Sequence, residues 1–97
     1  MISKTIHRRL AAISEELGAL RDEGAILAEQ LAFARDVVEE TRLRALVAET
    51  PLADRDLRVA GEDLRRIERV MADVDRQADR LRQEQDRLLA QASVELS

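Results

Sequence analysis

Small and apolar residues recur at alternating steps of three and four along two long stretches of the chain. The first series is Ile6, Leu10, Ile13, Leu17, Leu20, Gly24, Leu27, Leu31, Ala34, Val38, Thr41, Ala45 and Ala48. The second series is Leu57, Ala60, Leu64, Ile67, Met71, Val74, Ala78, Leu81, Gln85, Leu88 and Ala92. This spacing lines one stripe of a helix and is typical of coiled coils. It predicts two long helices, one over about 4–49 and one over about 52–95.

The two series do not share one phase. Continuing the first series past its end would place Val59, Arg66 and Asp73 in the apolar stripe, and two of these are charged. The only proline, Pro51, lies between the two series and favours the first position of a new helix, with Thr50 as its N-cap. Asp54 is an alternative N-cap.

A stripe that restarts after a break indicates a chain reversal. The sequence therefore predicts an all-α fold, in which a single domain over residues 1–97 forms a long antiparallel helical hairpin with its turn at about 49–54. Two registers match the stripes. In one the numbers of facing residues sum to 102, as for Leu31 and Met71, and in the other they sum to 105, as for Leu31 and Val74.

A second apolar face lies on the first predicted helix. Small residues recur there every seven positions from Ala11, and larger apolar residues accompany them. The outer face of the second predicted helix is charged, and Val70 is the one sizeable apolar residue that we expect to interrupt it. We therefore predict a dimeric four-helix bundle, or a complex with another helical protein. The interface residues that we predict are Ala19, Ile26, Phe33, Val37, Val47 and Val70.

Composition narrows the possible functions. The 97 residues carry 16 basic and 20 acidic side chains, and the net charge of −4 is divided equally between the two halves. Direct nucleic-acid binding is therefore not expected. The absence of cysteine removes disulfides and thiolate chemistry. No apolar run is long enough to span a membrane, and the first ten residues do not resemble a signal peptide, so we expect a soluble, cytoplasmic protein.

No arrangement of residues predicts catalysis. His7 is the only histidine, and no carboxylate follows it at helical spacing. The serines have no base at a recognisable spacing, and the glycines lie within the helical periodicity, where close helix packing is the expected reason for them. We therefore expect no enzyme activity, no cofactor, no metal and no small-molecule substrate. The predicted function is that of a structural or adaptor module acting through protein–protein contacts.

The residues of the predicted turn suggest an alternative function. Glu49, Asp54 and Asp56 come together there beside Leu52. An acidic tip on a helical hairpin resembles transcription factors of the Gre and DksA type, whose hairpins enter the secondary channel of RNA polymerase and use a pair of nearby carboxylates. This resemblance implies a regulatory factor in which Asp54 and Asp56 engage a larger machine.

Overall fold

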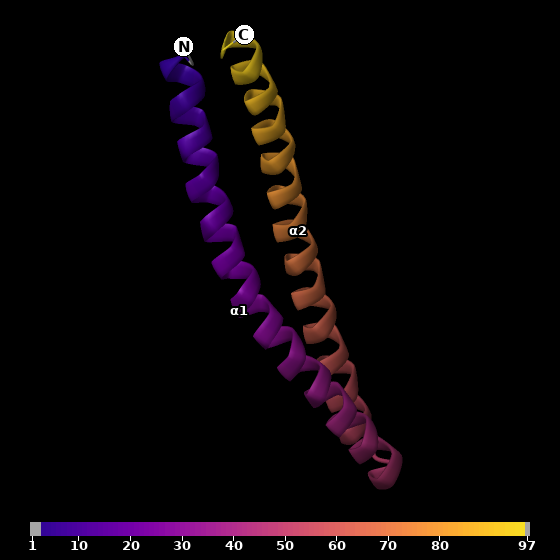
Figure 1. Cartoon of the computed structure of the whole chain (residues 1–97). Coiled ribbons are helices and arrows are strands. Elements are labelled where there is room, and N and C mark those ends of the chain that lie inside the picture. The colour runs from indigo at the N-terminus through magenta and orange to yellow at the C-terminus, as the bar shows by residue number, and fades with distance from the viewer. Residues whose placement is uncertain (1–2, 97) are drawn as a thin grey trace. The chain divides into compact units, whose positions relative to one another are not determined.

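The computed structural model describes residues 3–96 and contains two helices within that range. Helix α1 spans Lys4–Ala48 and helix α2 spans Pro51–Leu96. The chain divides into two compact units. Unit 1 comprises Met1–Gly24 and Asp73–Ser97, and unit 2 comprises Ala25–Ala72. Within each unit a segment of α1 packs beside a segment of α2 that runs in the opposite direction (Figure 1). The predicted antiparallel pairing of two long helices is confirmed.

Both helices begin at a side-chain cap. The Ile6 amide donates to the Ser3 hydroxyl oxygen at 3.2 Å, and the Ala53 amide donates to the Thr50 hydroxyl oxygen at 3.2 Å. Each bond satisfies one of the amides that a helix start leaves without a partner. The prediction of Thr50 as N-cap, with Pro51 as the first helical residue, is confirmed. Asp54 lies instead in the first turn of α2, where a negative charge compensates the helix dipole.

The connection between the helices consists of Glu49 and Thr50. Glu49 has a φ of 49°, in the left-handed region. Its amide donates to the Ala45 carbonyl at 3.1 Å, which is the hydrogen bond of an αL helix end. Glycine is the usual residue at this position because a side chain is strained there.

This short connection defines a register that differs from both expectations. The chain reverses between residues 49 and 50, so the numbers of facing residues sum to about 99. In unit 1 the Ser3 amide donates to the Glu95 carboxylate at 3.2 Å, and the numbers 3 and 95 sum to 98. The predicted sums of 102 and 105 are therefore wrong. The sum of 102 differs from the observed register by one step of three or four residues, and the sum of 105 by two steps. Such shifts still bring stripe against stripe, so the length of the turn separates these registers.

The core of each unit follows the two predicted series. The side chains buried within residues 3–96 are Ile6, Ile13, Leu27, Ala34, Val38, Thr41, Ala53, Ala60, Val74, Ala78 and Ala92. All except Ala53 belong to the predicted stripes, whereas Ala48, at the end of α1, is exposed. Thr41 is tolerated because its hydroxyl donates to the Val37 and Val38 carbonyls at 2.8 and 3.0 Å.

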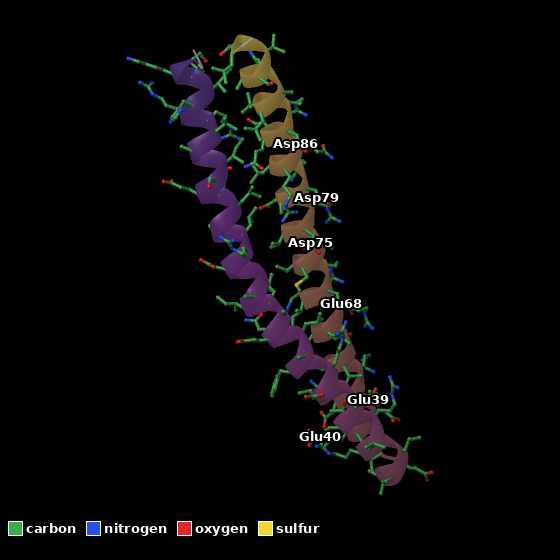
Figure 2. All side chains as sticks on the ribbon, in the orientation of Figure 1. Glu39, Glu40, Glu68, Asp75, Asp79 and Asp86 are labelled. Carbon is green, nitrogen blue, oxygen red and sulfur yellow. The ribbon has the colours of Figure 1, made fainter. Side chains whose placement is uncertain are left out.

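The outer surfaces of both helices carry charged side chains. Glu40 pairs with Arg44 on α1, and Asp79 pairs with Arg82 on α2 (Figure 2). Such exposed pairs contribute little to stability. Neither described helix contains a segment that is both long and apolar enough to cross a membrane.

Candidate interaction surface

A groove of about 760 Å³ lies between the two helices of unit 2. Helix α1 contributes Phe33 and Val37 to its lining, and α2 contributes Asp63, Arg66 and Val70. Phe33 is 71 % exposed although it is the only aromatic residue of the chain. An aromatic ring left in water beside other apolar groups is typical of a surface that a partner covers.

A second groove of about 330 Å³ continues the first towards the turn. Leu52, Asp56 and Val59 of α2 line it opposite Val37 and Thr41 of α1. Since Val37, Ala60 and Asp63 line both grooves, the two form one continuous surface. We call this surface the groove face and define it by the side chains of Phe33, Val37, Leu52, Val59, Asp63, Arg66 and Val70.

Helical periodicity explains why these residues share one side of α2. Leu52, Val59 and Arg66 recur every seven residues, as do Asp56, Asp63 and Val70. The two rows flank the buried stripe on the same side. This side therefore combines valine and leucine with one acidic row and one arginine.

The groove face carries charges of both signs. Asp63 and Arg66 form an ion pair one turn apart on α2, with 3.5 Å between Oδ1 and Nη2. Both side chains are more than half exposed, so water screens the pair and it holds the two groups only weakly. The two grooves together are also lined by Glu29, Arg55 and Asp56, so they offer acidic and basic groups beside apolar side chains.

Three of the six predicted interface residues lie together. Phe33, Val37 and Val70 line the larger groove, although Val70 comes from the other helix. Ile26 and Val47 are exposed in unit 2 but line neither groove. Ala19 is exposed and belongs to unit 1.

The predicted tip residues are divided between two environments. Leu52 and the half-buried Asp56 belong to the smaller groove, whereas Glu49 and Asp54 are exposed and line neither groove. Across residues 3–96, no three carboxylate or imidazole side chains lie close enough together to hold a metal ion.

This surface also includes three residues that were not predicted from the sequence, namely Val59, Asp63 and Arg66. The expectation that Val70 alone interrupts the charged face of α2 is wrong, because Val59 is 45 % exposed and Leu89 and Val94 are exposed further along α2. The seven-residue recurrence of Leu52, Val59 and Arg66 was the available signal.

Unit 1 contains a cleft of about 430 Å³ that is more polar than the groove face. Gly18, Gly24 and Ala78 help to line it. A methyl group added at Gly24 would have no neighbour within 4 Å. The expectation that this glycine serves close helix packing is therefore wrong, and the small residues leave open space instead.

Unit 1 is also joined by an ion pair between its helices. Arg9 donates from Nε and Nη2 to the two carboxylate oxygens of Glu84, at 2.6 and 2.8 Å. The hydrogen bond from Arg9 holds the pKa of the Glu84 carboxyl below its ordinary value, against the opposing effect of desolvation. The pKa of Arg9 is correspondingly raised, chiefly by the same hydrogen bond. This bidentate pair adds a polar contact between the two helix segments of unit 1.

Comparison of the chain with models of protein families, with curated proteins and with solved structures finds no match.

Proposed function

We propose that this protein is a non-enzymatic interaction module with a structural or adaptor role, and that the groove face is the surface through which it associates. The partner is an apolar helical surface, in the first place that of a second copy, so that two pairs of helices form a four-helix bundle. Phe33 carries the proposal, because its exposed ring lies beside Val37 and Val70 on a groove between two helices. As proposed, the module needs no cofactor and no catalytic group.

The total exposed surface supports the proposal. The chain exposes 7301 Å², whereas a folded monomer of 11.0 kDa exposes about 5,600 Å². The excess is about twice the roughly 800 Å² that each partner contributes to a stable interface of standard size. An interface of standard size would therefore remove about half of this excess.

Charge substitutions on the groove face test the proposal. Phe33→Glu would remove an apolar ring whose burial contributes about 2 kcal/mol. It would do so in both copies of a dimer, so we expect the dissociation constant to rise about a thousandfold. Val37→Glu, made separately, should act in the same direction because Val37 lines both grooves. The measurement is molar mass by light scattering, with helix content checked by circular dichroism.

Leu43→Glu is the matched control. Leu43 is 63 % exposed on α1 in unit 2, yet it lines neither groove. It should leave the mass of the associated species unchanged. An equal loss of mass in Leu43→Glu and Phe33→Glu, or an unchanged mass in Phe33→Glu, would show that the groove face is not the contact.

A further inference from the structure

Four side chains of the groove face are spaced symmetrically along α2, with a valine at each end and opposite charges between them. Val59, Asp63, Arg66 and Val70 follow one another at steps of four, three and four. An antiparallel copy of this segment presents valine to each valine, arginine to the aspartate and aspartate to the arginine. The symmetry lies in residues that already line the two grooves.

We propose that the groove face binds a second copy of itself about a two-fold axis that crosses α2 between residues 64 and 65. This inference rests on the proposed function and adds the position of the two-fold axis and the direction of the contact. Helix α2 of one copy then runs antiparallel to α2 of the other. Val59 lies opposite Val70 of the second copy, and Asp63 lies opposite Arg66 of the second copy. Such an isologous contact is closed, so association stops at the dimer.

The Asp63–Arg66 pair within each copy is weak enough to be replaced by pairs between the two copies. Asp63 and Arg66 are 3.5 Å apart at the atoms Oδ1 and Nη2 and are exposed, so their mutual attraction is screened by water. When two faces meet, each aspartate gains an arginine from the other copy in a site with less water. A nucleic acid or a peptide of one charge would satisfy only one of these two groups, and a second copy satisfies both.

The same two-fold axis also brings apolar residues of α1 from the two copies together. In the register of the turn, residues 64 and 65 of α2 face residues near 34 of α1. The axis therefore crosses α1 close to Phe33 and Val37, which are one turn apart. It places the exposed ring of Phe33 against Val37 of the second copy. The largest exposed apolar side chain of the groove face is then covered near the centre of the contact, where residues that dominate affinity usually lie.

Charge reversal tests the arrangement. Asp63→Arg alone places arginine opposite arginine twice in a dimer, and Arg66→Asp alone places aspartate opposite aspartate twice. Each variant should dissociate at concentrations about a hundredfold higher than the wild type, or more. An equal mixture of the two should recover the dimer mass, because a heterodimer restores both opposite-charge pairs. Asp79→Arg, which breaks a comparable exposed pair in unit 1, is the control and should leave association unchanged.

Single cysteines test the direction independently, since the chain contains none. Val59→Cys mixed with Val70→Cys should form a disulfide-linked heterodimer on mild oxidation. Val59→Cys alone should not, because the two copies of this position would lie eleven residues apart, which is roughly 16 Å along a helix.

The outcomes separate this inference from the proposed function. A wild-type dimer that Phe33→Glu dissociates, but whose charge variants are not rescued by mixing, would overturn the antiparallel arrangement and leave the proposed function standing. Cross-linking of Val59→Cys to Val37→Cys in place of Val70→Cys would do the same, since it places α1 opposite α2 of the second copy. A wild type that stays monomeric would overturn both.

Discussion

Replacing Glu49 by glycine should make the turn between the helices more stable. Glu49 holds a φ of 49° at the end of α1. A residue with a Cβ costs about 1–2 kcal/mol in this conformation, whereas glycine adopts it freely. Part of this gain is offset because glycine has more freedom in the unfolded chain. We therefore expect Glu49→Gly to raise the free energy of unfolding by about 1 kcal/mol, and the melting temperature by about 4–8 °C.

The assay is thermal and urea unfolding followed by circular dichroism at a fixed protein concentration. Ala48→Gly is the matched control, because Ala48 is the last residue of α1 and has no positive φ. There glycine should lower stability by up to about 1 kcal/mol. Equal destabilisation by both glycines would refute the left-handed conformation at Glu49 and with it the short turn that defines the register.

Three further predictions concern unit 1. Gly24→Ala should raise the free energy of unfolding by about 1 kcal/mol in urea titrations, because alanine favours the helix and its methyl group meets open space; destabilisation would show that the space is filled. Ile13→Ala should lower it by about 2–5 kcal/mol, since Ile13 is the one large side chain with no exposed surface in the described chain; a loss below about 1 kcal/mol would contradict this core. Because the pKa of Glu84 is lowered in the folded protein, its stabilising effect is present above the ordinary glutamate pKa and is lost as the pH falls through the folded pKa. Glu84→Gln should therefore flatten the acid limb of stability against pH, and an unchanged limb would show that the pair with Arg9 does not form in solution.

The helices and their pairing could be predicted from sequence because one physical pattern determines both. A stripe with a step of three or four favours burial against another helix, and the restart of the stripe after Pro51 indicates that the two helices fold back on each other. The register could not be predicted in this way. It depends on Glu49 adopting a left-handed conformation, which its residue type does not favour, and this shortens the turn to two residues.

The candidate site was predicted on one helix and largely missed on the other. Phe33 and Val37 stand out on α1 because they are large apolar residues outside the stripe. Val59 and Val70 are separated on α2 by many charged residues, and their common side becomes evident only when the two rows are placed beside α1. Asp63 and Arg66 look like an ordinary helical ion pair in the sequence. They belong to the candidate interaction surface because they line the same groove as Phe33.

The central claim is that a second copy covers the groove face of unit 2. Sedimentation equilibrium of the wild-type chain over a range of micromolar concentrations tests it most directly. We expect a reversible change from 11.0 kDa to twice that mass as concentration rises, with no larger species. A constant mass of 11.0 kDa up to the highest concentration would contradict it.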